Sequence, residues 1–461
     1  MQEAKGSTRD MSKMSTVEMQ IAERLRKYPD EALTNLNQFI DEDLLEECFQ
    51  LLNKRSAAGV DGQTWRDYNE NRKEKIAQLH AAFKKGTYRA PNIRRVYIPK
   101  GDGKDRPLGL PTIEDKILQT AVTKVLSVIY EPIFSNSSYG FRPGKSQHQA
   151  LEELFRQVSF KGKRYIIDAD MQNYFGSINH QCLREFLDRK IKDGVVRKMI
   201  DKWLKAGVLE EGQVVYPTEG TPQGGTISPL LSNIYLHYVL DEWFEGEVQP
   251  RMKGSSFLIR FADDFLLGFT NEEDARRVME VLPKRMARYR LSLHPEKTKL
   301  VRLDTEVQDR SNRTFDFLGF THHMGTSLKG MRILKRQTSR KKFKASLLKM
   351  KEWLNENRHG QLEGIVAELN RKLRGYYEYY GITFNGRRLQ EYYDQVQKLL
   401  YRSVNRCGGR HLTWEAFAQR IKVWCPLLRP KLYHSYLLAK PKTEEPYAGK
   451  PLVRVCGGAV R

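Results

Sequence analysis

Apolar positions along the chain recur at two spacings, one typical of helices and one typical of strands. Helical spacing covers residues 17–54, 66–84, 111–130, 180–206 and 271–290, the last with Pro283 inside it. Strand-like stretches are shorter and cover residues 94–100, 165–171 and 257–269, the last reading as strand, turn and strand. Because these elements alternate without regular βαβ units, the pattern predicts an α+β domain. From about residue 330 the pattern becomes mainly helical.

The segment RFADDFLLGF, residues 260–269, places two adjacent aspartates inside an apolar stretch. Aspartate is depleted in strands, so Asp263 and Asp264 are expected at the tip of a hairpin, where they can face a cleft. Neighbouring carboxylates repel each other, and burying one without a partner is costly. A divalent cation would relieve both penalties, while an ordinary solvated turn is the alternative interpretation.

Two further acids occupy the apolar segment RYIIDADM. Asp168 and Asp170 are two positions apart on an expected strand and therefore share one face. They could simply end a strand and pair with Lys163 or Arg164. If one of them instead lies opposite the Asp263–Asp264 tip, three carboxylates could hold two cations about 3.5–4 Å apart, the arrangement used for nucleotidyl transfer.

Seven segments in one chain order carry a family resemblance over about residues 50–400: RRVYIPKGDGKDRPLGLPTIEDKILQTAV, YGFRPGKSQHQAL, DADMQNYFGSINH, EGTPQGGTISPLLSNIYL, IRFADDFLLGF, LSLHPEKTKL and FDFLGF. Together with AAGVDG ahead of them, they resemble the bacterial group II intron reverse transcriptase/maturase family, within the retron-type reverse transcriptases. The resemblance implies a right-hand polymerase fold, with fingers and palm built from antiparallel sheet plus helices, followed by a helical thumb/maturase domain. The implied domains are 1–62 (helical extension), 63–325 (fingers and palm), 326–430 (thumb/maturase) and 431–461 (basic tail).

The resemblance also implies site residues. Asp170, Asp263 and Asp264 match the catalytic metal ligands, for Mg²⁺ with Mn²⁺ able to substitute. Asp170 is preferred to Asp168 because Phe175 lies five residues later, where the family has an aromatic that packs under the sugar and excludes a 2′-hydroxyl. Asp168 is expected to be a structural acid.

Further family positions match residues expected to contact the incoming nucleotide. Lys100 and Arg106 would grip the triphosphate, since arginine binds phosphate as a bidentate fork and lysine as a point charge. Gln223 and Gly224 would lie beneath the nucleotide, where glycine lets backbone approach a ligand. Lys297 is the preferred proton donor to pyrophosphate, with Lys299 left open. The chain departs from the family by having Phe261 where tyrosine is commoner and Gly176 where aspartate is usual.

The charge is unevenly placed. The chain carries a formal net charge of +23, and residues 321–461 hold 29 Lys and Arg against 10 Asp and Glu. A polyanion such as nucleic acid is the simplest partner for this surplus, with a solvated charged surface or contact with an anionic membrane surface as the alternatives. The expected contacts are Arg340, Lys341, Lys342, Lys344, Arg371, Lys372 and Arg374. The apolar stripe of residues 364–384 is expected to be core.

The five cysteines have no zinc or disulfide-framework spacing, which fits a reducing compartment. No apolar segment reaches the ~18 residues that span a bilayer, and the N-terminal residues have no apolar signal region. A bacterial cytoplasmic protein acting at the nucleoid, without membrane contact and either monomeric or dimeric, is therefore expected. Nothing in residues 409–461 resembles an HNH endonuclease.

The resemblance implies an RNA-directed DNA polymerase that uses an RNA template, a DNA primer and dNTPs. It also implies binding to a group II intron RNA, assistance of its splicing, and retrohoming. One alternative is a domesticated polymerase in DNA repair or phage defence, which flanking intron sequence would distinguish. Another is an RNA-binding splicing factor without polymerase activity, against which the intact aspartates argue.

Overall fold

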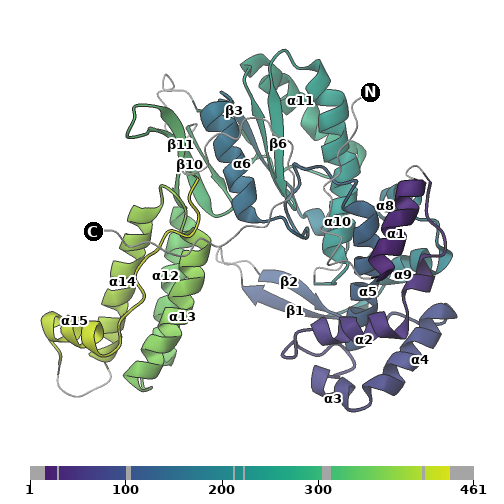
Figure 1. Cartoon of the computed structure of the whole chain (residues 1–461), viewed down its shortest axis with the longest axis horizontal. Coiled ribbons are helices and arrows are strands. Elements are labelled where there is room, and N and C mark those ends of the chain that lie inside the picture. Colours follow the sequence, from purple (N-terminus) through teal and green to yellow (C-terminus); the bar gives the residue numbers. More distant parts are fainter. Residues whose placement is uncertain are drawn as a thin grey trace. The chain divides into compact units, whose positions relative to one another are not determined.

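The structure is a computed structural model that describes residues 16–28, 31–99, 105–210, 213–221, 224–303, 313–406 and 411–436 (Figure 1). The chain divides into two compact units, Met1–Lys335 and Arg336–Arg461. Each has its own apolar core. The mixture of sheets and helices confirms the predicted α+β class.

The first unit begins with short helices, so the helical pattern predicted over residues 17–54 is present as separate elements. They are α1 (Thr16–Lys27), a 3₁₀ turn (Leu36–Phe39), α2 (Glu42–Leu51), α3 (Trp65–Glu70) and α4 (Arg72–Lys84). Between the first two helices, Leu33 pairs with Ile191 as an isolated bridge, and Asn35 has a left-handed φ of 57°. The Asp41 carboxylate then caps α2 by accepting from the Leu44 N–H.

The expected hairpin near residue 100 is confirmed in a four-stranded sheet. Strands β1 (Ile93–Pro99) and β2 (Asp105–Leu110) pair antiparallel. The order is β2-β1-β4-β5, with β4 (Val208–Glu210) parallel to β1 and β5 (Gln213–Val215) at the edge. The helix α5 (Ile113–Tyr130) follows β2 and starts at a Thr112 cap.

A second sheet, here called the palm sheet, positions the candidate site. Its order is β6-β7-β3-β8, formed by Ser256–Phe261, Asp264–Phe269, Tyr165–Asp170 and Lys299–Arg302, with antiparallel pairing throughout. Helix α6 (Gln147–Phe160) packs against β6, and α11 (Glu272–Arg288) packs against β3 and β7 (Figure 1). Pro283 lies inside α11 and does not end it. The strand–turn–strand prediction for residues 257–269 is therefore confirmed.

Apart from β4 and β5, the elements between β3 and β6 are helical. They comprise α7 (Tyr174–Ser177), α8 (His180–Asp188), α9 (Gly194–Leu204), α10 (Ser228–Leu236) and π-helical segments at His237–Asp241 and Phe244–Val248, followed by a 3₁₀ turn at Gln249–Arg251. The helical prediction for residues 180–206 is confirmed, as two helices rather than one. Asp193 stops that continuity because its carboxylate caps α9 by accepting from the Val196 N–H.

The chain then forms a three-stranded sheet and a helical bundle. The sheet order is β11-β10-β9, formed by Arg332–Thr338, Phe320–Thr326 and Thr314–Phe317, and the division between the two units falls within β11. The bundle contains α12 (Arg340–Glu356), α13 (Leu362–Tyr380), α14 (Gly386–Val404) and α15 (Trp414–Val423). Leu369, Leu373 and Tyr377 are fully buried, so the predicted core stripe is confirmed. Across the described ranges, no helix is both long and apolar enough to cross a membrane.

Candidate active site

The palm sheet brings together four aspartates, which we call the palm carboxylates: Asp168, Asp170, Asp263 and Asp264. Asp170 on β3 is directly opposite Asp264 on β7. Since cross-strand partners share a face, and Asp168 is two residues before Asp170, three of the acids lie on one side of the sheet. Asp263 is next to them in the two-residue turn Ala262-Asp263 between β6 and β7, here called the aspartate turn.

Ionising all of these acids in the protein alone is unfavourable. Burial raises the pKa of Asp264 well above its ordinary value, and the neighbouring carboxylates of Asp168, Asp263 and Asp170 raise it further. A backbone hydrogen bond from Leu318 acts in the opposite direction. Burial also raises the pKa of Asp168 to about 7, although the nearby Lys299 ammonium lowers it. The site is therefore short of positive charge.

Lys297 supplies part of that charge. Its Nζ lies 2.6 Å from Oδ2 of Asp170. The other proton-donor candidate, Lys299, lies opposite Asp168 on β8 and donates to the Thr314 carbonyl at 3.3 Å. Asp170 thus pairs with Lys297 rather than with Lys163 or Arg164, the partners considered from sequence.

The palm carboxylates offer the hard oxygen ligands that Mg²⁺ and Mn²⁺ prefer. Their mutual repulsion and burial are penalties that a divalent cation would remove. Within the described ranges, however, no three side chains of His, Cys, Asp or Glu adopt a geometry that could hold a metal ion. The donor chemistry therefore fits the cation, while a complete three-residue site would need the side chains to move.

Phe175 lies on the short helix α7 directly after β3. Its ring is partly buried against the core and makes an edge contact with Tyr174, with the ring centroids 5.4 Å apart. The Phe175 carbonyl accepts from the Thr221 N–H at 2.8 Å, and the Gly220 N–H donates to Ile178 at 2.8 Å. The loop before the TPQGG segment is thereby docked on α7.

Gly224 has a φ of 111°, and a Cβ built there would lie 2.3 Å from the Gly109 carbonyl oxygen on β2. Only glycine permits this approach. Arg106 also lies on β2, with its backbone opposite Ile98. Lys100, Gln223 and the Arg106 side chain lie outside the described part of the structure, so their nucleotide contacts stay predictions.

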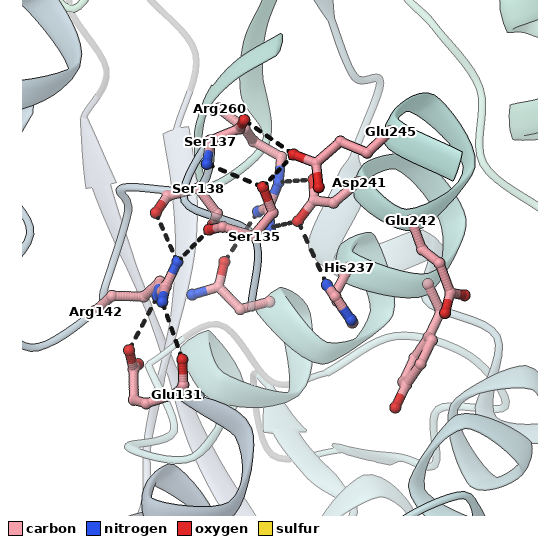
Figure 2. A network of polar contacts seen from close by, with 12 residues as sticks. Glu131, Ser135, Ser137, Ser138, Arg142, His237, Asp241, Glu242, Glu245 and Arg260 are labelled. Atoms are coloured by element: carbon pink, nitrogen blue, oxygen red, sulfur yellow. Dashed lines mark hydrogen bonds and ion pairs between the residues drawn. The ribbon is translucent and has the colours of Figure 1, made fainter. Parts of the chain in front are cut away.

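Sequence reasoning missed the residues that support the palm carboxylates. Arg260 on β6 is fully buried and forms an ion pair with Asp241 (Figure 2). It also donates to the Ala262 carbonyl in the aspartate turn. Leu318, in the turn of FDFLGF, supplies the backbone hydrogen bond to Asp264. The available signals were a charged residue inside the apolar strand of IRFADD and the turn residues of FDFLGF.

The predicted nucleic-acid contacts lie on two helices of the second unit. The four on α12 are exposed and occupy its first turns: Arg340, Lys341, Lys342 and Lys344. On α13, Arg371 and Lys372 lie 2.6 and 3.7 Å from Glu368, while Arg374 is exposed. Positive charge at a helix N-terminus opposes the helix dipole, so the α12 cluster stabilises its own helix poorly.

A basic cavity of about 470 Å³ lies in the first unit, between the end of α4, the start of α9 and residues 34–37. Five lysines line it: Lys84, Lys85, Lys192, Lys198 and Lys202. Asp193, its one carboxylate, already accepts from the Asn37 N–H and side-chain amide at 3.0 Å. The lining therefore carries a surplus of positive charge.

Comparison with known proteins places these elements in a family. Residues 98–322 match the family model for reverse transcriptase (RNA-dependent DNA polymerase), and residues 331–423 match that for the group II intron maturase-specific domain. The group II intron-encoded protein LtrA of Lactococcus lactis subsp. cremoris is 40% identical over 225 residues, which cover 48% of this chain and 37% of LtrA. Protein YkfC of Escherichia coli (strain K12) is 32% identical over 278 residues, covering 52% of this chain and 71% of YkfC.

The two matched models follow one another along the chain, as the sequence motifs predicted. The chain spans little more than a third of the length of LtrA, so that similarity concerns shared domains rather than the whole relative. The match to YkfC extends over most of that protein. On this evidence the chain belongs to the family of group II intron reverse transcriptases and maturases.

Proposed function

We propose that the chain is an RNA-directed DNA polymerase that copies RNA into cDNA and assists the splicing and mobility of a group II intron RNA. The observation that carries the proposal is the register of the palm sheet. It sets Asp170 opposite Asp264, with Asp263 in the adjoining turn. Two strands far apart in sequence thus bring acidic residues together, which nucleotidyl transfer by two metal ions would require.

Asp170, Asp263 and Asp264 would hold two Mg²⁺ ions, which supply the Lewis-acid chemistry that activates a primer 3′-hydroxyl and stabilises the leaving pyrophosphate. Asp168 stays outside this set and contributes a buried acid beneath it. Lys297 is well placed to donate a proton to the departing pyrophosphate, because its Nζ is already at the carboxylates. Lys299, which is hydrogen-bonded to the Thr314 carbonyl rather than to Asp170, is the alternative donor.

The nucleotide would be positioned by groups around the same edge of the sheet. Phe175 would press on its sugar and exclude ribonucleotides, while Gly224 would let the backbone lie close beneath it. The side chains of Lys100 and Arg106 would bind the triphosphate, and Gln223 the sugar or base. The docking of the Gly220–Thr221 backbone on α7 supports this arrangement, because it holds Phe175 and the TPQGG loop together.

RNA binding is supported by two basic features described independently in the two units. One is the exposed cluster at the start of α12, and the other is the lysine-lined cavity between α4 and α9. Lysine and arginine side chains bind a nucleic-acid backbone with an affinity that falls as salt rises. On α13, Arg374 is the better candidate, since Glu368 partly neutralises Arg371 and Lys372.

Primer extension on an RNA template with purified protein tests the proposal. Asp264→Asn should reduce dNTP incorporation by orders of magnitude, because it removes a ligand charge without changing the shape of the side chain. RNA affinity, measured by filter binding, should stay close to that of the parent. Asp43→Asn, at an exposed position on α2, is the matched control and should retain full activity.

Two results would contradict the proposal. If Asp264→Asn extended primers as well as the parent does, the assignment of the site would be wrong. If the parent bound RNA and extended no primer with either Mg²⁺ or Mn²⁺, the chain would be a splicing factor without polymerase activity.

A further inference from the structure

Beneath the aspartate turn lies an ion pair that is entirely shielded from water. Arg260 and Asp241 are both 0% exposed. Nε of Arg260 lies 2.8 Å from Oδ1 of Asp241, and Nη2 lies 2.6 Å from Oδ2, so the pair is bidentate. A buried ion pair is often no more stabilising than apolar residues of similar volume. Stability alone therefore does not explain why charge is placed here.

The third guanidinium nitrogen reaches the aspartate turn itself. Nη1 of Arg260 donates to the Ala262 carbonyl at 3.1 Å and to Oδ1 of Asn233 at 3.0 Å. Ala262 has a φ of 58°, in the left-handed region that residues with a Cβ rarely adopt. Such conformations persist where surrounding contacts impose them, and they concentrate at functional sites. The hydrogen bond from the Arg260 guanidinium is one of the contacts that hold Ala262 in this conformation.

A second set of contacts joins residues 137–140 to β6 and to the aspartate turn. The Arg260 N–H donates to Ser137 and its carbonyl accepts from the Tyr139 N–H, both at 2.8 Å. Asn233 Nδ2 donates to the Gly140 carbonyl at 2.8 Å. A Cβ on Gly140 would lie 2.3 Å from the Ala262 nitrogen, so this segment packs directly against the turn.

Figure 2 shows that the Arg260–Asp241 pair lies within a wider network of polar contacts. Arg142 donates to the Ser135 and Ser138 carbonyls and pairs with Glu131, with Nε 3.1 Å from Oε2. Glu245 accepts from the Ser137 hydroxyl at 3.0 Å. Asp241 itself lies in the π-helical segment His237–Asp241, a geometry found frequently at functional sites. Residues 137–140, which face the aspartate turn, are therefore themselves held in place.

We propose that Arg260, oriented by Asp241 and Asn233, is a positioning residue that fixes the aspartate turn and thereby sets the affinity of the palm carboxylates for divalent cations. The inference rests on the proposed function, because it concerns the same carboxylates. Arginine suits the role since its planar fork reaches acceptors on three residues at once, which the single ammonium of lysine cannot do in the same geometry.

The test measures cation binding directly, apart from catalysis. Mn²⁺ is titrated into the full-length protein without nucleic acid, and free Mn²⁺ is followed by electron paramagnetic resonance. Arg260→Lys keeps the charge that Asp241 needs but loses the reach to Ala262. We expect it to weaken Mn²⁺ binding about tenfold or more, and to raise the Mg²⁺ concentration needed for half-maximal primer extension. The KM for primer–template should stay within about twofold of the parent, a range typical of changes that leave a binding surface intact.

A merely structural role predicts a different pattern. Leu45→Ala removes buried side-chain volume from α2. It serves as the control for lost stability, and the Mn²⁺ affinities of the two variants are compared where their urea midpoints match. It should leave Mn²⁺ affinity unchanged, and an equal weakening in Arg260→Lys and Leu45→Ala would overturn the proposal. Parent-like Mn²⁺ affinity in Arg260→Lys would also overturn it.

Asn233→Ala covers the case in which Arg260→Lys fails to fold, because it leaves the buried ion pair intact. It removes one acceptor of the guanidinium and the donor to Gly140, and should weaken Mn²⁺ binding by a smaller factor than Arg260→Lys does. Unchanged Mn²⁺ binding in Asn233→Ala would overturn the proposal. Asp264→Asn is the reference for the site. If the parent and Asp264→Asn bound Mn²⁺ equally, the proposed function would fail as well, whereas a difference between them with a parent-like Arg260→Lys would refute the positioning role alone.

Discussion

Replacing Gly140 with alanine adds one methyl group at the point where two backbone segments meet. The added Cβ would lie 2.3 Å from the Ala262 nitrogen and 2.9 Å from the Phe261 carbonyl carbon. Ordinary van der Waals contact begins at 3.4 Å, so one segment must move by about 1 Å. Neither can move easily, because hydrogen bonds between Arg260 and residues 137 and 139 join them.

The size of the effect follows from that displacement. Overpacking a well-packed interior costs about 1–3 kcal/mol, so Gly140→Ala should lower the free energy of unfolding by this amount. A catalytic group misplaced by about 1 Å can lose about 100-fold in rate. Because the displaced turn carries Asp263 and precedes Asp264, we expect primer extension to fall by roughly that factor.

Urea unfolding and primer extension measure the two effects on the same preparation. Gly246→Ala is the matched control, since a Cβ at that helical position would meet nothing within 4 Å and its φ is not positive. It should keep full activity and gain slightly in stability. The reasoning is refuted if Gly140→Ala matches the parent in both urea midpoint and primer extension.

Three further outcomes are expected. Phe175→Ala should admit ribonucleotides, measured as the ratio of rNTP to dNTP incorporation, and unchanged discrimination would make Phe175 an ordinary core residue. Burial raises the pKa of Asp115 to about 7, opposed by hydrogen bonds from Trp203 and Tyr88. Its protonated form therefore stabilises the fold fully below about pH 4, and that contribution of about 4 kcal/mol is lost as pH rises through 7. Asp115→Asn should abolish this part of the pH dependence of the free energy of unfolding, measured with urea. Identical pH profiles for the parent and the variant would contradict the assignment. Lys344→Ala should reduce the slope of log affinity for RNA against log salt by about 0.7–0.9, and an unchanged slope would exclude a phosphate contact there.

The hairpin of β6 and β7 could be predicted from sequence because its signals are local. Short apolar runs flank two aspartates, and both halves of the hairpin lie within fourteen positions of each other. The pairing of Asp170 with Asp264 is different, since it joins strands that are far apart in the chain. Only the family resemblance predicted that these two acids meet. Local patterns specify strands, while the order of strands in a sheet depends on the whole packed core.

The residues that support the palm carboxylates were harder to predict, because their positions depend on buried polar partners. A charged residue in a strand is normally expected at the surface, and Arg260 is buried only because Asp241 and Asn233 approach it from other elements. The three-stranded sheet of β9, β10 and β11 was also missed, since the segment FTHHMGT lacks the density of β-branched and aromatic residues that marks a strand. In both cases tertiary contacts override a weak local signal.

The two cores described above have no residue in common, and this affects what a melting experiment on the chain can mean. The buried set from Met350 to Leu427 contains nothing from the buried set that ends at Leu291. A chain built in this way need not denature as a single cooperative event, so its two parts can have different transition temperatures. Damage to the palm can leave the helical bundle intact, and the two parts can accumulate substitutions at different rates during evolution.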